Sequence, residues 1–260
     1  MTDVQNQPDT RGIKIKRTGV TGVRLPFFIS DGANVQQVAA QIRFTVALAE
    51  NLRGTHMSRL TEILTTRTKS PIKIPDVEKI LLDALKKLST DEAAISIAFK
   101  YFFEKISPVT QKVSFSSVDC EFFGRIVRGG RMNFSLSLSV PFMSLCPCSK
   151  EISDFGAHNQ RSVCRVKLTF KNFDDVSIEK FVRLIESQGS AQVFPILKRE
   201  DEKFVTEAAW QNPKFVEDIL RDVVLALRRE KNLSAFSVEC ENFESIHNHN
   251  AFAAHEEILS

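Results

Sequence analysis

Two cysteines and a histidine stand close together in one short stretch of this 260-residue chain. Cys146 and Cys148 flank a proline, and His158 follows in the same segment. A thiolate and an imidazole are good ligands for zinc and other transition metals. Because the second ligand pair of a closed zinc site is missing from the sequence, the stretch predicts an open site with room for a water that ionises near neutral pH. The alternative is a pair of structural cysteines in a surface loop.

A second group of residues with possible chemistry follows the last strand that the pattern predicts. It contains Glu244, His247 and His249. A His-x-His spacing places both rings on one face of an extended segment. We therefore predict a functional role for this group, with a solvated tail as the alternative.

A third group is the charged run at residues 197–203, which includes Lys198, Arg199 and Glu202. Such a run is usually a solvated loop. Glu217 differs because it stands near the start of a predicted helix, beside an apolar stripe. Residues 54–59 are another possible site, although His56 could equally be a surface helix residue.

Alternating apolar residues predict the strands that must position these groups. The segment 113–122 also alternates, but its phase changes at Ser116 and Ser117, which predicts a bulge. The regular cases are Ile42, Phe44, Val46 and Leu48; Ile95, Ile97, Phe99 and Tyr101; Phe134, Leu136, Leu138 and Val140; Cys164, Val166, Leu168 and Phe170; and Phe236, Val238 and Cys240.

Apolar residues at helical spacing predict four helices between these strands. Ser177 is a good cap for the third helix, and Asn212 with Pro213 predicts the start of the fourth. The stripes are Met57, Leu60 and Leu64; Val77, Ile80, Leu81, Ala84, Leu85 and Leu88; Ile178, Phe181, Val182 and Ile185; and Val216, Ile219, Leu220, Val223 and Leu227.

The predicted elements repeat along the chain. Residues 1–19 form a polar tail that we expect to be mobile. Two strands, two helices and two strands then occupy residues 20–127, and nearly the same order returns in residues 128–260. We predict an α+β fold of two fused modules, each an antiparallel sheet with a helix pair between its second and third strands.

Composition limits the classes of function. A net charge of +3 does not argue for nucleic acid, but it allows a local basic cluster. An odd number of cysteines, five, makes a secreted disulfide framework improbable. No apolar run is long enough for a membrane span, and the N-terminus lacks the apolar region of a signal peptide. We expect a cytoplasmic protein.

Several long motifs resemble the blocks of type IB GTP cyclohydrolases, in the family's order and over almost the whole chain. They are residues 54–59, 144–161, 198–207, 212–218 and 242–249. The resemblance implies a tunnelling fold and a homotetramer whose sheets join edge to edge. It also implies conversion of GTP and water to 7,8-dihydroneopterin triphosphate and formate, the first step of folate biosynthesis, and no organic cofactor.

The resemblance also implies roles for individual residues. Cys146, His158 and Glu202 would hold a divalent metal (manganese, zinc or iron), whose bound water attacks C8 of guanine. Glu217 would anchor the purine. Cys148, His247 and His249 would transfer protons, oriented by Glu244, and the triphosphate would contact Lys150, Arg161, Lys198 and Arg199.

Two other functions stay open at this point. A nitrile reductase shares the fold and uses a nucleophilic cysteine, but it needs NADPH and no catalytic metal. A non-catalytic module with a structural zinc would bind metal and turn over nothing. The sequence does not give the physiological metal or the later use of the pterin.

Overall fold

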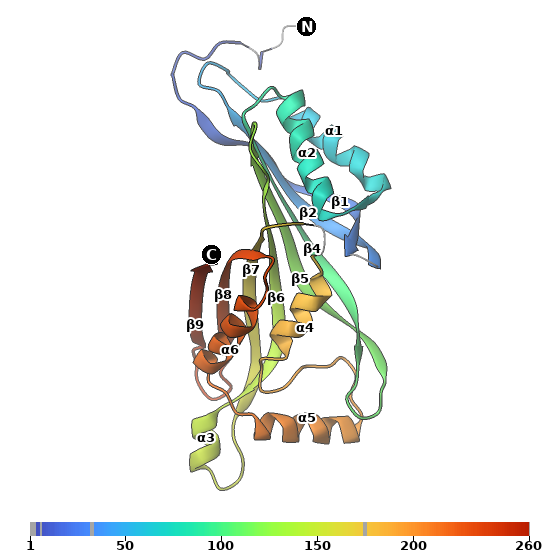
Figure 1. The fold of residues 1–260 in the computed structure, drawn as a ribbon, viewed down its shortest axis with the longest axis vertical. Helices are drawn as coiled ribbons and strands as arrows, with labels where there is room; N and C mark the ends of the chain where they lie inside the picture. The colour runs from blue at the N-terminus through green and yellow to red at the C-terminus, as the bar shows by residue number, and fades with distance from the viewer. Residues whose placement is uncertain (1–3, 6, 32–33, 174–175, 260) are drawn as a thin grey trace. The chain divides into compact units, whose positions relative to one another are not determined.

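A computed structural model describes residues 4–5, 7–31, 34–173 and 176–259. Its strands belong to one sheet of order β3-β1-β2-β4-β5-β6-β7-β8-β9, and helices lie between them in sequence, as Figure 1 shows. The strands are β1 (Ile15–Asp31), β2 (Asn34–Leu48), β3 (Pro71–Ile72), β4 (Glu92–Ile106), β5 (Val113–Val127), β6 (Asn133–Leu145), β7 (Asn159–Phe170), β8 (Leu233–Asn242) and β9 (Ala251–Ile258). The helices are α1 (Met57–Thr66), α2 (Ile74–Lys87), α3 (Pro147–Ile152), α4 (Ile178–Glu186), α5 (Arg199–Gln211) and α6 (Val216–Arg228), with a 3-10 turn at Arg67–Lys69.

The chain forms two compact units that are not continuous in sequence. Unit 1 takes residues 1–100, 121–136 and 172–176, and unit 2 takes residues 101–120, 137–171 and 177–260. The long strands β4, β5 and β6 therefore contribute to both units. The division into modules 20–127 and 128–260, which the repeat predicts, stays a prediction.

Unit 1 packs the helix pair α1 and α2 beside strands β1 and β2 (Figure 1). Five of the six apolar residues predicted for α2 are buried, and so are Leu60 and Leu64 of α1, whereas Leu88 and Met57 are half-buried. Phe122 makes edge-to-face contacts with Phe99 and Phe134, at ring-centroid distances of 5.1 and 5.5 Å. Gly124 is required in this core, since a Cβ there would lie 2.8 Å from Cγ1 of Val77.

Part of the predicted N-terminal tail is built into unit 1. β1 begins at Ile15, and a short antiparallel bridge joins Pro8 to Leu52. The backbone N–H groups of Arg53 and Gly54 donate to the carbonyls of Gln7 and Gln5, each at 3.1 Å. These bonds fix the loop that leads into α1.

The bulge predicted in β5 is wrong. Burial alternates in one phase along the strand, with Ser114, Val118 and Cys120 on the buried side. Val113 and Phe115 lie on the other side and are 56% and 66% exposed. These two residues are apolar, which suggested a change of phase, but their side chains are exposed at the surface.

Unit 2 has more helix than its sequence predicts. α4 begins at the predicted cap, where Ser177 Oγ accepts from the Lys180 N–H at 3.3 Å, and Phe181 packs edge-to-face on Phe170. α5 occupies the charged run that resembled a solvated loop. Asn212 and Pro213 do not start α6, because Asn212 caps the end of α5 and α6 begins at Val216.

α5 is anchored by a buried carboxylate rather than by an apolar stripe. Asp201 is fully buried, and its Oδ1 accepts from the backbone N–H groups of Val109 and Thr110 at 2.8 and 2.9 Å. Its Oδ2 accepts from the Thr110 hydroxyl at 2.5 Å and from the Lys198 N–H at 2.9 Å. Burial would raise the pKa of Asp201, but the hydrogen bonds from Thr110, Lys198 and Val109 outweigh it and hold that pKa well below its usual range.

A buried ion pair joins β4 to α4 in unit 2. Lys105 and Glu186 are each 3% exposed and pair directly, and the Lys105 ammonium lies 4.7 Å from the Phe194 ring centroid. Burial lowers the pKa of Lys105, and the neighbouring Glu186 charge offsets part of that change. Removing one partner would leave an uncompensated buried charge.

We expect Lys105→Met to lower the free energy of unfolding by about 3–5 kcal/mol, because Glu186 would then be buried without its partner. The measurement is urea unfolding followed by circular dichroism. Lys180→Met is the control: Lys180 also pairs with a glutamate but is 55% exposed, so its loss should cost about 1 kcal/mol or less. Equal costs for the two variants would contradict the role of the buried pair.

Candidate functional site

Cys146 lies where β6 gives way to α3. It is the N-cap residue of that helix, Pro147 takes the first helical position, and Cys146 Sγ accepts from the Ser149 N–H at 3.4 Å. The Cys146 N–H donates to the carbonyl of His158 at 3.1 Å. The two ends of the loop are thus pinned together, which brings the predicted thiolate and imidazole ligands to adjacent backbone positions.

His158 is held by a chain of polar side chains that leads into the protein. Its Nδ1 lies 2.9 Å from Gln160 Oε1, and Gln160 Nε2 donates to Ser144 Oγ at 2.8 Å. Ser162 Oγ donates to the same Ser144 oxygen at 2.9 Å. His158 Nδ1 thus faces the oxygens of Gln160 and Glu244, an arrangement that favours the tautomer with the proton on Nδ1 and a lone pair on Nε2.

The donor set at this loop fits a divalent metal. A metal-ligating histidine usually donates its other ring N–H to a fixed acceptor, which sets the tautomer and orients the ring. Gln160 does this for His158, and Glu244 Oε2 lies 3.8 Å from the same Nδ1, with both side chains 11% exposed. His158 Nε2 and Cys146 Sγ are therefore suited to hold a borderline metal ion.

The five cysteines differ in burial. Cys120, Cys164 and Cys240 are buried, whereas Cys146 is half-buried and Cys148 is exposed. Contact with Cys240, together with burial, raises the pKa of the Cys164 thiol well above its ordinary value. Only the cysteines of the predicted site are thus placed to meet a ligand.

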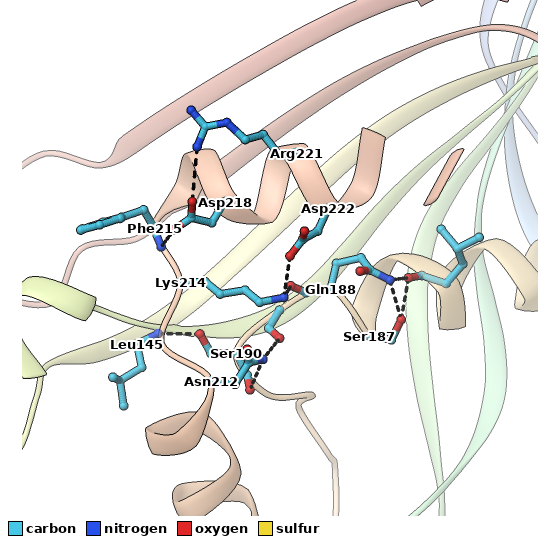
Figure 2. A network of polar contacts seen from close by, with 12 residues as sticks. Leu145, Ser187, Gln188, Ser190, Asn212, Lys214, Phe215, Asp218, Arg221 and Asp222 are labelled. Carbon is cyan, nitrogen blue, oxygen red and sulfur yellow. Dashed lines mark hydrogen bonds and ion pairs between the residues drawn. The ribbon is translucent and has the colours of Figure 1, made fainter. Parts of the chain in front are cut away.

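The end of β6 is also tied to the segment before α6, as Figure 2 shows. The Leu145 N–H donates to Ser190 Oγ at 3.1 Å, and the Leu145 carbonyl accepts from the Lys214 N–H at 3.1 Å. Lys214 Nζ in turn bonds to the Gln188 carbonyl and to Asp222 of α6. These bonds fix the residue before Cys146 against the chain that leads to Glu217.

Close packing supports the same junction. Gly189 precedes Ser190, and a Cβ on Gly189 would lie 2.8 Å from the Phe142 side chain of β6. The side-chain amide of Asn212 donates to the carbonyls of Gly189 and Ser190 at 3.1 and 3.3 Å. Asn212, which was predicted as a helix start, thus braces the loop beside the site.

The carboxylates that are predicted to bind the metal and the purine lie in the first turns of two helices. Glu202 is in the first turn of α5, and Glu217 is in the first turn of α6. Both are exposed. Lys198 and Arg199 are exposed at the start of α5. The structure therefore places all four residues at the surface, where they are accessible to a substrate.

Glu244, His247 and His249 lie between β8 and β9. The two imidazole rings are stacked, with centroids 5.2 Å apart and planes at 18°. Both histidines are exposed, whereas Glu244 reaches back towards His158. The structure therefore brings the second predicted group to the first through Glu244.

The two basic residues of the loop have different surroundings. Lys150 Nζ donates to the Trp210 carbonyl at 2.5 Å and lies 4.8 Å from the Trp210 ring centroid, so it ties α3 to α5. Arg161 is exposed on β7, where its carbonyl accepts from the Phe243 N–H at 3.1 Å. Contact with a triphosphate would require Lys150 to leave Trp210.

Across the described residues, no three histidine, cysteine, aspartate or glutamate side chains gather closely enough to hold a metal ion. The backbones of Cys146 and His158 are hydrogen-bonded, and Glu244 lies near the His158 ring. The structure does not bring Cys146, His158 and Glu202 into one group. That ligand set stays a prediction.

Sequence reasoning missed the residues that support His158. Gln160, Ser144 and Ser162 are buried and polar, and they stand at the ends of β6 and β7. Asn242 is 3% exposed and pairs with Ser162 in the β7–β8 register, and its Oδ1 is buried without a hydrogen-bond partner in the part of the chain that the structure describes. A run of polar residues on the buried phase of a strand was the signal available.

Comparison with known proteins gives consistent matches over the chain. A model of the family described as type I GTP cyclohydrolase folE2 matches residues 1–253. A protein of Geobacter sulfurreducens named GTP cyclohydrolase FolE2 is 45% identical over 258 residues, covering 99% of this chain and 98% of that protein. A protein of the same name from Nitrosomonas eutropha is 44% identical over 254 residues, 97% of this chain and 94% of that protein.

Solved structures are similar in fold alone. A uricase from Bacillus fastidious aligns with a TM-score of 0.57 and 8% identity, covering 94% of each chain. Urate oxidase from Bacillus subtilis 168 aligns with a TM-score of 0.55 and 10% identity, covering 93% of this chain and 98% of that chain. These are tunnelling-fold proteins, and the predicted fold class is confirmed.

Proposed function

Because this chain belongs to the type I GTP cyclohydrolase family, and with it to the GTP cyclohydrolases of folate biosynthesis, we propose that it converts GTP and water to 7,8-dihydroneopterin triphosphate and formate. The observation that supports this chemistry most directly is the buried support of His158. The contact of Gln160 with Nδ1 favours the tautomer in which Nε2 is free to bind a metal, and the backbones of His158 and Cys146 are hydrogen-bonded to each other. An unused surface histidine would not need that support.

The proposed metal ligands are Cys146, His158 and Glu202. A bound divalent metal would supply Lewis acidity and lower the pKa of a water at the site. The protein's own part is to fix the ligands: Ser149 sets the Cys146 rotamer, and Gln160 orients the imidazole. Glu202 would come from the exposed first turn of α5.

Proton transfer is assigned to Cys148, His247 and His249. All three are exposed, so they are accessible to a substrate and to water. Glu244, next to His158, would orient the group from its base. Ring opening of the purine requires protons to be delivered to and removed from ring nitrogens, and imidazoles do this near neutral pH.

Substrate binding is assigned to the starts of α5 and α6. Glu217 would accept hydrogen bonds from guanine N1 and N2, and the α6 N-terminus also favours its negative charge. Lys198, Arg199, Arg161 and Lys150 would contact the triphosphate. Guanine recognition by a carboxylate distinguishes GTP from ATP, since adenine lacks those two donors.

The direct test is formate release from GTP by purified, metal-loaded protein. Formate and the pterin triphosphate should form in equal amounts without NADPH. A nitrile reductase would require NADPH and release no formate, and a binding module with structural zinc would bind metal without any product. Either result would overturn the proposed function.

Glu217→Gln should reduce kcat/KM for GTP by about 10- to 100-fold, because the guanine donors lose a charged acceptor. Steady-state formate release against GTP concentration measures this. Glu62→Gln, an equal change of charge on an exposed residue of α1, should match the wild type. Turnover of ATP as fast as GTP by the wild-type protein would remove the anchoring role.

We further propose a homotetramer in a reducing cytoplasm. β9 is the last strand of the sheet and pairs with β8, and its exposed side includes Phe252 and Ile258, which are 60% and 88% exposed. An apolar edge strand is a template for pairing with another chain. Native mass spectrometry tests the tetramer.

Among the residues that the structure describes, every helix is too short or too polar to span a bilayer.

A further inference from the structure

The turn between β4 and β5, at residues 107–112, is hydrogen-bonded to the start of α5 (Figure 1). The backbone N–H groups of Val109 and Thr110 both point at Oδ1 of Asp201. Successive N–H groups that converge in this way form a concave site for an anion. Here the anion is a carboxylate of the protein itself, 91 residues after Thr110 in the sequence.

Hydrogen bonds within the turn fix its shape. The Ser107 N–H donates to the Lys112 carbonyl at 3.0 Å, and the Lys112 N–H donates to Ser107 Oγ at 2.9 Å. Gln111 takes a left-handed φ of 54°, and its side-chain amide donates to the carbonyls of Ser107 and Pro108 at 3.3 and 3.1 Å. The turn therefore has its own support, and its N–H groups are held ready for the carboxylate.

The two hydroxyls of the turn point in one consistent direction. Thr110 Oγ1 donates to Asp201 Oδ2 at 2.5 Å and lies 3.0 Å from Ser107 Oγ. A hydroxyl has one hydrogen to donate, so Thr110 accepts from Ser107. Ser107 is 1% exposed. A chain of polar side chains thus runs from the buried base of the turn to Asp201.

The same carboxylate also closes the start of α5. Asp201 Oδ2 accepts from the N–H of Lys198, the N-cap residue, at 2.9 Å. One side chain therefore binds the helix start and the β4–β5 turn together. Apolar packing adds little at this end, because Val205 and Ala209 are the only other buried residues of α5. Asn212 supports the far end of the helix.

Glu202 follows Asp201 directly and is exposed. Its own packing therefore does not decide where its carboxylate points, and the helix turn that carries it does. We propose that Asp201 is a positioning residue: held by the β4–β5 turn, it sets the direction in which the first turn of α5 presents Glu202 to the metal site. The inference rests on the proposed function, in which Glu202 is a metal ligand.

The test uses Thr110→Val in the full-length protein, a change that removes the donor to Oδ2 and keeps both backbone N–H groups. Amide exchange in peptides that cover residues 199–207 should become about tenfold faster, because the start of α5 opens more often when a bond to a charged group is lost. The midpoint of Mn²⁺ binding, measured by equilibrium dialysis, should rise about tenfold, as expected when support of a metal ligand is lost.

Two further variants of the hairpin serve as rescue and control. Thr110→Ser keeps the donor and should restore both values. Ser114→Ala also removes a hydroxyl from this hairpin, but Ser114 Oγ donates to the Lys105 carbonyl at 3.0 Å rather than to α5. It should therefore leave the exchange of residues 199–207 and the Mn²⁺ midpoint unchanged. Asp201→Asn should give larger changes than Thr110→Val, and if it folds poorly, Thr110→Val still decides the question.

Formate release separates positioning from a general loss of stability. Thr110→Val should lose activity at low Mn²⁺ and regain most of it at saturating Mn²⁺, with KM for GTP close to that of the wild type. Unchanged exchange in residues 199–207, or an unchanged Mn²⁺ midpoint, would refute the positioning role. Failure of the proposed function differs from this, because the wild type would then release no formate while exchange and Mn²⁺ binding still report on Asp201.

Discussion

Cys146→Ala should lose its bound metal and lower kcat/KM for formate release by at least about 1,000-fold. Lewis-acid chemistry contributes several kcal/mol of transition-state stabilisation, and each 1.36 kcal/mol is a factor of ten in rate. The thiolate is the strongest ligand in the proposed set. Elemental analysis and formate release measure the two losses independently.

The fold should survive this substitution. Cys146 is half-buried at the start of a six-residue helix, and the change removes one capping contact to the Ser149 N–H. Loss of a cap costs about 0.5–2 kcal/mol. Cys146→Ser can retain the cap without a thiolate, so it should lose metal as well while unfolding closer to the wild-type temperature. Stoichiometric metal in both variants would remove Cys146 from the ligand set.

Two neighbouring residues give graded comparisons. Cys148→Ala should keep stoichiometric metal and still lose activity, because we assign Cys148 to proton transfer.

Gln160→Leu should weaken metal binding by about 10- to 100-fold, as expected when the partner of a ligating histidine is removed. A Gln160→Leu variant with wild-type metal affinity would show that His158 is oriented by another group.

The elements predicted best from sequence are those whose burial follows a simple period. β2, β4, β6, β7 and β8 alternate as their apolar residues do, and α2 buries five of the six apolar residues that the spacing gives. One face of each element lies in a core, so apolar residues recur in the sequence at the period of that element. The tunnelling fold followed from the longer motifs and not from this pattern.

The elements that were missed are held by other forces. α5 buries Asp201 with only Val205 and Ala209, so its strongest anchor is a set of hydrogen bonds that no hydropathy pattern reveals. β9 alternates only between half-buried and exposed positions, and its sequence shows no alternation of apolar and polar residues. Asn212 and Pro213 have the right types for a helix start, but the Asp218 carboxylate accepts from the Phe215 N–H at 3.1 Å and starts α6 later.

The sequence singles out candidate ligands, which stay a prediction, but it does not reveal the residues that support them. Cys146 and His158 have side chains with few structural uses in a loop, so their chemistry is visible in the sequence. Gln160 and Ser144 are ordinary strand residues, and their role depends on a hydrogen-bond chain that exists only after β6 and β7 pair. Glu202 stands in the first turn of α5, a separate element, so its position relative to them cannot be read from the sequence.

Protein stripped of metal by a chelator should be inactive in formate release and regain activity with more than one divalent ion, including manganese. The proposed ligands are one thiolate, one imidazole and one carboxylate. The carboxylate and water suit Mn²⁺, whereas the thiolate and imidazole suit Zn²⁺ and Fe²⁺. Such a mixed set excludes none of these ions by ligand type.

Affinity and activity should then rank the ions differently. Binding should follow the Irving–Williams order, with zinc tighter than manganese, because that order holds for most mixed nitrogen, oxygen and sulfur sites. At equal concentration, the ion that binds more tightly should also raise the unfolding temperature more, since a ligand that binds only the folded state stabilises it. This thermal shift, read together with elemental analysis, reports binding without relying on turnover.

Activity need not follow that ranking, because the reaction requires an open coordination position and an exchangeable water in addition to tight binding. Reloading stripped protein with each ion separately gives both orders side by side. Restoration by zinc alone would indicate a site closed to harder ions, and activity that survives complete stripping would exclude a metal role. A thermal shift that Cys146→Ala abolishes for every ion, while Cys148→Ala retains it, would tie the order of affinities to the loop between β6 and β7.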